Sequence, residues 1–398
     1  MPTKLRHATA NEFKQVAHLS ARSFSRDYGR RTNYFYEALI GPGAQPHLAR
    51  VLEVDGKIVA SVRIQDLQMK FGESVLRVGG IADVGTDPEH RRKGYAARVM
   101  KDSVKHMAKE GFDISVLFGI SDYYDRFGYI SSLPSTSISI GVADALKAPR
   151  KIRGRAFKAS DMPAVKRLYQ QTGSLIWGNA VRNRPEWEHR SSRFEGARVF
   201  TMGKSIVAYS ILDASDSNCS ILEFGAQEDI EILGSLLRDA AETADRNRAG
   251  KIGIHAPADL PLLTAFTDYG LNISTTFPRN GGGMARITNL QSAVHKMLPQ
   301  WSNHLTEAKA RPPGPFAIKT DLGNVAISVK GRRLIPGEGR PRLSLALPQK
   351  RLMQLMLGYQ PPEFILAKDD VKCSRDLAET IIALFPRRYA YIWPHDHF

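Results

Sequence analysis

The chain has 398 residues, of which 42% are hydrophobic and 24% charged, a mix typical of globular proteins that excludes an intrinsically disordered chain. At the usual domain size, this length corresponds to about two to four domains. The 56 lysines and arginines against 40 acidic residues give a net charge of +16, which favours anionic partners such as nucleic acid or a phosphorylated cofactor.

Simple patterns argue against several other classes. No apolar run approaches the roughly 20 residues that span a bilayer, and residues 1–6 lack the pattern of a signal peptide, so we expect a cytoplasmic protein without a membrane partner. Cys219 and Cys373 lie far apart and have no metal-type spacing, so neither a disulfide nor a metal site is expected. No zinc-finger or aromatic RNA-binding motif makes nucleic acid a specific partner, and a basic, solvated surface explains most of the charge.

The first predicted segment runs from residue 1 to about 150 and reads as a mixed α/β sheet. Asn11 is expected to cap a first helix, and Asp55-Gly56 predicts a tight hairpin turn. A second helix is expected from Gly94 to Gly111, where glycine allows a left-handed helix stop. The expected strands cover residues 3–9, 50–54, 57–64, 75–84 and 112–118.

The second segment, about 151–290, repeats features of the first. The amphipathic pattern that begins at Ala10 recurs from Ala159, and the hairpin strand 57–60 recurs at 205–208 with nearly the same offset. Two sequence patterns that recur at matching spacing indicate a duplicated fold.

The third segment, about 291–398, has short alternating strands and two helices before an aromatic tail. The strands are expected over 316–319, 325–329 and 343–347, and the helices over 350–357 and from Ser374 to Phe385.

The most informative stretch lies between Val84 and Ala96, where a strand ends and a basic loop opens a helix. The backbone N–H groups at this helix start have no intrahelical partners, and with the helix dipole they suit a pyrophosphate. Gly94 lets the chain approach phosphates closely. Three consecutive basic residues oppose the dipole unless an anion is present, so we favour a ligand over a merely basic helix start.

These residues resemble the acetyl-CoA loop of the GNAT superfamily, whose pattern Arg/Gln-x-x-Gly-x-Gly/Ala is met by Arg91, Gly94 and Ala96. The stretch Tyr-Tyr-Asp-Arg-Phe-Gly-Tyr at 123–129 resembles the segment that closes the GNAT fold. The resemblance implies an N-acetyltransferase with acetyl-CoA as cosubstrate and an amine acceptor, either a small molecule or a peptide. The residues expected to contact the cofactor are Val84, Gly85, Thr86, Arg91, Arg92, Lys93, Gly94, Tyr95 and Ala96.

The order of the segments resembles the enhanced-intracellular-survival (Eis) type of acetyltransferase. This implies tandem GNAT-like mixed sheets with flanking helices, the second one degenerate, followed by an α/β domain similar to sterol carrier proteins. The implied domains are 1–150, 151–290 and 291–398, and the implied assembly is a homo-oligomer, a hexamer by family resemblance. A non-catalytic acyl-CoA or lipid-binding protein is the alternative.

Amine acylation needs a general acid for the departing thiolate and a base for the amine. The resemblance assigns the acid to Tyr124, with Tyr123 as its alternative, and the base to the C-terminal carboxylate of Phe398. The reference pKa of such a carboxyl, about 3.5, is low for a base, but burial among aromatic rings raises it. His395 and His397 are alternative bases.

The acceptor pocket departs from the Eis pattern, because enzymes that acetylate cationic aminoglycosides are expected to carry acidic pockets. This chain is basic, and the residues before Tyr124 offer one carboxylate, Asp122. We therefore do not predict aminoglycosides as substrates. Residues that could add acid or wall the pocket, or else serve other roles such as core packing, are Asp27, Glu37, Asp66, Trp177, Trp187 and Arg190.

Overall fold

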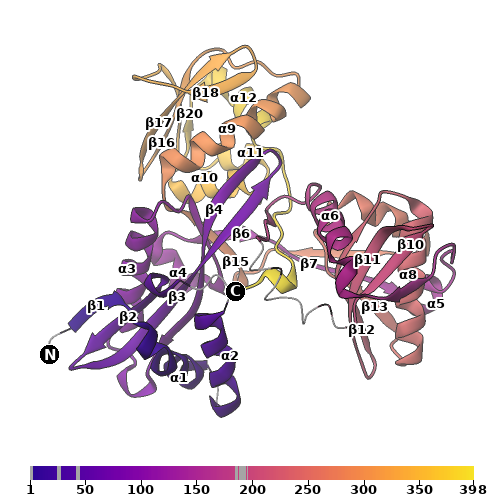
Figure 1. Cartoon of the computed structure of the whole chain (residues 1–398). Coiled ribbons are helices and arrows are strands. Elements are labelled where there is room, and N and C mark those ends of the chain that lie inside the picture. Colours follow the sequence, from indigo (N-terminus) through magenta and orange to yellow (C-terminus); the bar gives the residue numbers. More distant parts are fainter. Residues whose placement is uncertain (1–2, 25–27, 42–44, 184–186, 188–193, 195) are drawn as a thin grey trace.

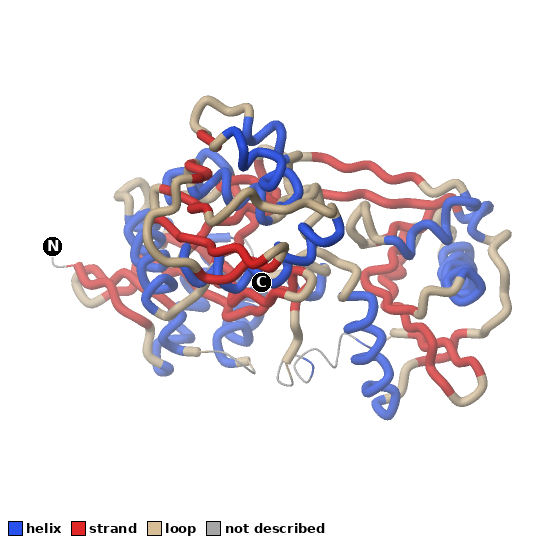
Figure 2. Tube along the Cα trace, turned by 90° about the horizontal axis from the view of Figure 1, so that it is seen from above, coloured by secondary structure: helices blue, strands red, loops and turns tan. Residues whose placement is uncertain are grey.

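The computed structural model describes residues 3–24, 28–41, 45–183, 187, 194 and 196–398 (Figure 1). They form a mixed α/β protein with three sheets, as the sequence predicted. Figure 2 shows two lobes side by side, with strands running between them. No helix in the described part of the chain is long and apolar enough to cross a bilayer.

Among the described residues, eight strands form the first sheet, in the order β1-β2-β3-β4-β5-β15-β6 with β9 paired to β3. Helices α1 (Phe13–Phe24) and α2 (Tyr28–Ile40) pack on one face through residues such as Val51, and α3 (Tyr95–Lys109) packs on the other through Leu52. The strands are β1 (Thr3–His7), β2 (Ala49–Val54), β3 (Lys57–Phe71), β4 (Ser74–Thr86), β5 (Ile114–Ile120), β6 (Ile130–Leu133), β9 (Asn179–Ala180) and β15 (Asn280–Ile287).

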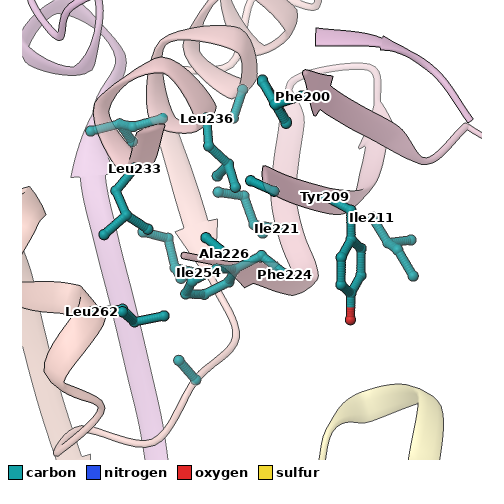
Figure 3. Close-up of a cluster of buried hydrophobic side chains, with 14 of the residues drawn as sticks. Phe200, Tyr209, Ile211, Ile221, Phe224, Ala226, Leu233, Leu236, Ile254 and Leu262 are labelled. Carbon is teal, nitrogen blue, oxygen red and sulfur yellow. The ribbon is translucent and has the colours of Figure 1, made fainter. Parts of the chain in front are cut away.

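The second sheet has the order β14-β7-β13-β12-β11-β10-β8 and its own apolar core (Figure 3). Helices α5 (Val142–Ala145), α6 (Met162–Gly173) and α8 (Ile230–Arg246) flank it, and Leu236 of α8 is fully buried against the sheet. The strands are β7 (Ser135–Gly141), β8 (Gly154–Ala156), β10 (Arg198–Met202), β11 (Ser205–Ser215), β12 (Asn218–Ala226), β13 (Lys251–Ile254) and β14 (Asn272–Thr276).

The two sheets repeat one plan, in line with the repeated pattern in the sequence. In each, a 3-10 turn leads into a helix: η1 (Ala10–Glu12) precedes α1, and η5 (Ala159–Asp161) precedes α6. In each, an antiparallel hairpin is followed by a parallel pair, β4 with β5 and β12 with β13.

The two sheets also exchange strands, which the sequence did not predict. Strand β7 follows β6 in the chain but pairs with β13 and β14 in the second sheet. Strand β15 comes after the second sheet's strands but pairs between β5 and β6 in the first. The expected division at residues 150 and 290 therefore describes the chain order, whereas the second sheet takes β7 from the first segment and the first sheet takes β9 and β15 from the second.

The third sheet, β18-β17-β16-β19-β20, packs with helices of the same segment. Its core is continuous with the first sheet, because Val78 and Val116 belong to the same buried cluster as Trp301 of α9. The elements are α9 (Leu290–Glu307), β16 (Phe316–Thr320), β17 (Gly323–Lys330), β18 (Arg333–Pro336), β19 (Leu343–Ala346), α10 (Gln349–Met356), α11 (Pro362–Leu366), β20 (Lys372–Cys373) and α12 (Ala378–Leu384). The likeness of this segment to sterol carrier proteins stays a prediction.

One helix start was predicted wrongly. Asn11 lies inside η1 and does not cap α1. Instead, Thr9 donates from its backbone N–H and its hydroxyl to the Glu12 carboxylate, at 2.8 and 2.9 Å. The predicted end of α3 is confirmed, since Gly111 follows the helix with a φ of 78°.

Candidate active site

The parallel strands β4 and β5 separate partway along their length. Their pairing runs from Val78 opposite Ile114 to Gly80 opposite Val116, although β4 continues to Thr86 and β5 to Ile120. Beyond Gly80, β4 pairs only with β3 among the described strands. The backbone groups of β4 that face β5 are therefore outside any strand ladder and can pair with an extended amide-containing ligand.

A bulge in β4 lies at this opening. Asp83 has a φ of 52°, and the register with β3 shifts between Ser61 and Arg63. The Asp83 carboxylate accepts from Arg63 Nε at 2.6 Å, which holds the bulge in place. The predicted contact residues Val84, Gly85 and Thr86 follow directly, so they line one side of the opening.

The basic loop after β4 leads into α3 as predicted. Arg92 and Gly94 both have left-handed backbones, with φ of 61° and 75°, a conformation that aims successive N–H groups outward. In the described part of the chain, the N–H groups of 92–97 donate to no protein acceptor. Gly94 supplies no capping side chain, so the helix start is open to an anion.

A pocket of about 200 Å³ lies at this helix start. Its lining includes Arg91, Arg92, Gly94, Tyr95 and Ala96, together with Thr86. The structure thus brings most of the predicted contact residues around one cavity. Lys93 is exposed beside it, and Val84 and Gly85 lie on the adjoining stretch of β4.

Two residues that line this pocket were not predicted from the sequence to contact the cofactor. Tyr123 lines the pocket, and its buried hydroxyl has no hydrogen-bond partner among the described groups. Arg126 also lines it, donates from Nε to the Tyr123 carbonyl at 2.9 Å and stacks over the Tyr123 ring at 4.5 Å. The motif at 123–129 contains both, but its link to the pocket depends on the turn that follows β5.

The equivalent helix start in the second sheet differs in charge and in capping. Residues 227–229, Gln-Glu-Asp, precede α8, and Asp229 accepts from the N–H groups of Glu231 and Ile232 at 2.8 and 3.0 Å. A capped, acidic start repels phosphates. The second domain therefore has no counterpart of the basic loop.

Tyr124 lies on the α3 face of the first sheet. Its ring fills the space beside Gly119, where a β-carbon would lie only 2.3 Å away. Burial, with a smaller effect of Tyr123, raises the pKa of Tyr124 to about 12. The phenol therefore keeps its proton at neutral pH, as a general acid must.

The last residue of the chain reaches the opposite face of the opening. A β-carbon on Gly80 would lie 2.8 Å from the Phe398 ring, and the rings of Phe398 and Phe118 are 6.1 Å apart. Side chains alternate along a strand, and α3 covers the face to which Gly79 points. Its neighbour Gly80 therefore points to the face away from α3. Phe398 and Tyr124 thus approach the separation of β4 and β5 from opposite faces.

The two alternative bases occupy different places. His397 stacks on Phe118 with ring centres 4.4 Å apart, and burial lowers its pKa. His395 lies 3.7 Å from the Glu223 carboxylate of the second sheet. His397 is the histidine of the tail that contacts the first sheet.

Two of the candidate acidic residues are already ion-paired. Asp122 pairs with Arg279 at 2.8 Å, and Asp66 pairs with Arg77 at 2.7 Å. Glu37 is exposed on α2, and Asp27 lies outside the described residues.

The two tryptophans expected either at the pocket or in a core are core residues. Trp177 contacts Phe71 edge-on, packs beside His304 and donates to the Met356 carbonyl at 3.1 Å. Trp187 is buried in the core of the second sheet. Arg190 lies outside the described residues.

Comparison with known proteins defines the class. Residues 4–131 match the family model described as an acetyltransferase (GNAT) domain. The chain thus contains a GNAT acetyltransferase domain and is an N-acetyltransferase by class, with an acyl-CoA as cosubstrate. No curated protein matches the chain.

Solved structures share the whole architecture. The GCN5-related N-acetyltransferase of Anabaena variabilis superposes with a TM-score of 0.78 over 100% of both chains at 17% identity. A probable N-acyltransferase from Enterococcus faecalis gives 0.76 over 98% of both chains at 15% identity. Eis1 from Mycobacterium abscessus gives 0.68 over 97% of this chain and 99% of its own, at 15% identity. At these identities the likeness establishes the fold.

Proposed function

We propose that the protein moves an acetyl group from acetyl-CoA to an amine by direct attack, with Tyr124 as general acid and the α-carboxylate of Phe398 as general base. The observation that supports the proposal is that both residues border the opening between β4 and β5, each from its own face of the sheet. Phe398 packs on Gly80, where β4 and β5 separate, and Tyr124 packs on Gly119 on the other face.

The proposed step conserves atoms and charge. The amine nitrogen attacks the thioester carbonyl, the carboxylate of Phe398 takes the proton that the amine loses, and the carbon–sulfur bond breaks as Tyr124 protonates the leaving thiolate. The open N–H groups at the start of α3, with Arg91 and Arg92, hold the pyrophosphate. The β4 backbone from Val84 to Thr86 orients the pantetheine amides.

The acceptor in this proposal is a small-molecule or peptide amine of low positive charge. Two carboxylates that were candidates for binding a polycation, Asp122 of α4 (Ser121–Tyr124) and Asp66 of β3, are already ion-paired with arginines. We expect the enzyme to act as a homo-oligomer, which light scattering on the purified protein measures. Acetyl-CoA with a panel of amines, followed through thiol release, identifies the acceptor and stays silent for a pure acyl-CoA or lipid-binding protein.

Substitution at the paired tyrosines tests the acid. Tyr124→Phe keeps the ring and removes the proton, so turnover is expected to fall by about 10²–10⁴-fold while calorimetric affinity for acetyl-CoA stays near that of the parent. Tyr123→Phe is the matched control. Full activity of Tyr124→Phe beside an inactive Tyr123→Phe would move the role to the neighbour.

Extension of the chain tests the base. Residues added after Phe398 displace its carboxylate, so a C-terminal tag is expected to lower turnover strongly, and an N-terminal tag is not. Intact mass spectrometry must show that neither tag is trimmed. Full activity of the C-terminally tagged protein contradicts the proposal and directs attention to His397, which contacts Phe118, and then to His395.

A further inference from the structure

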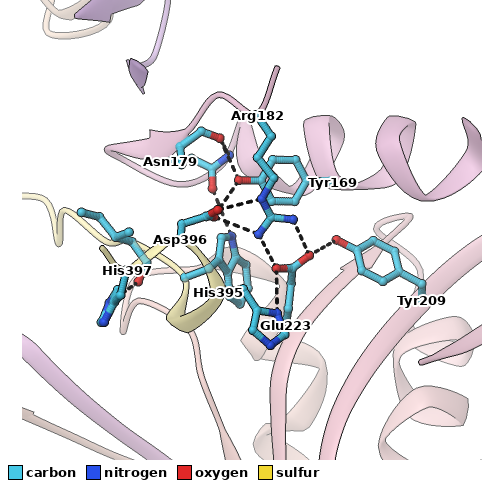
Figure 4. A network of polar contacts seen from close by, with 11 residues as sticks. Tyr169, Asn179, Arg182, Tyr209, Glu223, His395, Asp396 and His397 are labelled. Carbon is cyan, nitrogen blue, oxygen red and sulfur yellow. Dashed lines mark hydrogen bonds and ion pairs between the residues drawn. The ribbon is translucent and has the colours of Figure 1, made fainter. Parts of the chain in front are cut away.

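A buried polar network ties the tail to the second domain (Figure 4). Arg182 donates from Nε and Nη2 to the two oxygens of Asp396, both at 2.8 Å, and from Nη1 to Glu223 at 3.0 Å. The side chain of Arg182 is 2% exposed, and those of Glu223 and Asp396 are 0% exposed. Tyr169 and Tyr209 add hydrogen bonds to the two carboxylates, at 3.1 and 2.8 Å.

The network lies where the second sheet opens. Strands β12 and β13 pair only at Ser220–Gly253 and Ile221–Ile254, and Glu223 stands two residues further along β12. The first sheet opens in the same way after Gly80, and there the opening is proposed to take the cofactor. In the second domain, the turn η9 (Pro394–Asp396) of the tail lies against β12 instead.

Apolar packing holds the same part of the tail. Trp393 is 1% exposed within the core of the second domain, and its ring lies 6.1 Å from Phe224 of β12. Its Nε1 donates to Asn179 at 3.0 Å. The opening of the degenerate domain is therefore occupied by the chain itself.

A buried ion-pair network is poor evidence for stability, because desolvation of the charges offsets much of their attraction. Such groups can instead select one arrangement of the chain. Burial opposes ionisation of Glu223, but Arg182, His395 and Tyr209 outweigh it and keep the pKa of this carboxyl below its ordinary value. Glu223 therefore stays charged at neutral pH and holds Arg182, which donates two hydrogen bonds to Asp396.

We propose that Arg182, held between Glu223 and Asp396, is a positioning residue for Phe398, and that the second domain has kept its opening as a clamp for the tail. Two residues of extended chain span at most about 7 Å, so a fixed Asp396 confines Phe398 to the region of Gly80 and Phe118. The inference rests on the proposed function only in its effect on turnover. The clamp itself can be measured without activity.

Carboxypeptidase digestion measures the clamp directly. Asp396→Asn keeps the shape of the side chain, removes its charge and leaves Arg182 paired with Glu223. Release of Phe398, followed by mass spectrometry, is expected to become about tenfold faster or more, because cleavage follows the population of the opened tail. Asp161→Asn is the matched control: this carboxylate makes a two-pronged pair with Arg155 in the same domain, at 2.7 and 2.8 Å. Equal release rates in both variants and the parent would overturn the clamp.

Turnover and a double-mutant cycle separate positioning from general stability. Asp396→Asn is expected to lower kcat by about 10–100-fold with unchanged affinity for acetyl-CoA, since displacement of a reacting group by about 1 Å costs up to 10²-fold. In a chain that lacks Phe398, the same substitution is expected to have no further effect, because it acts through the missing residue. Losses that multiply in the double variant would show a structural role and overturn the proposal.

A milder variant covers the case in which Asp396→Asn does not fold. Tyr169→Phe removes one donor to Asp396 and is expected to speed release of Phe398 by a smaller factor, with an unchanged rate as the contrary result. If a chain without Phe398 keeps full turnover, the proposed base is wrong, whereas faster release of the tail in Asp396→Asn would still establish the clamp.

Discussion

Glycine at position 80 leaves room for the end of the chain, and its replacement by alanine tests the position of Phe398 with one added methyl group. A β-carbon at Gly80 would lie 2.8 Å from two ring atoms of Phe398 and 2.9 Å from a third. Gly80 does not have a left-handed backbone, so alanine fits the strand without strain. The perturbation therefore acts on the tail and not on the sheet.

The size of the effect follows from the contact distances. Carbon atoms in favourable contact are about 3.5–4.0 Å apart, so the ring of Phe398 must retreat by about 0.7–1.2 Å. A displacement of about 1 Å of a reacting group can cost as much as 10²-fold in rate. We expect kcat of Gly80→Ala to fall by about 10–100-fold.

Thiol release at saturating acetyl-CoA measures kcat, and calorimetry measures the affinity for acetyl-CoA, which is expected to stay unchanged because the basic loop is untouched. Gly141→Ala is the control, since its β-carbon would meet no heavy atom closer than 3.8 Å. Parent-like turnover of Gly80→Ala would refute the reasoning, because the chain end would then be catalytically irrelevant or free to adapt.

Three further predictions address the cofactor, the acid and the fold. Gly94→Glu is expected to abolish calorimetric binding of acetyl-CoA, whereas Gly94→Ala, which shares the strain of a φ of 75°, is expected to keep most of it; equal losses would contradict the anion site. Tyr124 is expected to ionise near pH 12, and the difference between ultraviolet titrations of the parent and of Tyr124→Phe measures this. Because folding raises the pKa, the neutral phenol stabilises the fold fully below the ordinary pKa of 10.0, and this contribution is lost as the pH rises through about 12. Leu236→Ala is expected to destabilise the second domain by about 2–5 kcal/mol in denaturant unfolding, because it leaves a cavity in a buried core, and a loss below about 1 kcal/mol would contradict that packing.

Local signals in the sequence predicted local structure well. Asp55-Gly56 predicted the hairpin that joins β2 and β3, and the basic loop with Gly94 predicted the start of α3 within one residue. These features depend on turn chemistry and periodicity, which a few neighbouring residues determine. The gathering of the loop residues around one pocket followed from the same short stretch.

Pairing between strands that are distant in the chain could not be predicted from the sequence. Nothing in the residues of β15 shows that they insert between β5 and β6, because register between distant strands depends on the finished sheet. Arg182 and Asp396 likewise look like ordinary surface charges until the fold buries them against Glu223. The family resemblance predicted a catalytic role for the Phe398 carboxylate, but nothing in the sequence pointed to Gly80 as the residue on which its ring packs.

The exchange of β7 and β15 has a consequence for biosynthesis. Among the described strands, β6 joins the first sheet through β15 alone, so a polypeptide made as far as the end of β6 would leave β6 unattached and the edge of β5, with Phe118, exposed. Such an open edge invites pairing with other chains. The first sheet therefore cannot be completed on the ribosome before β15 has been translated, so we expect the two lobes to acquire their native form together rather than in succession.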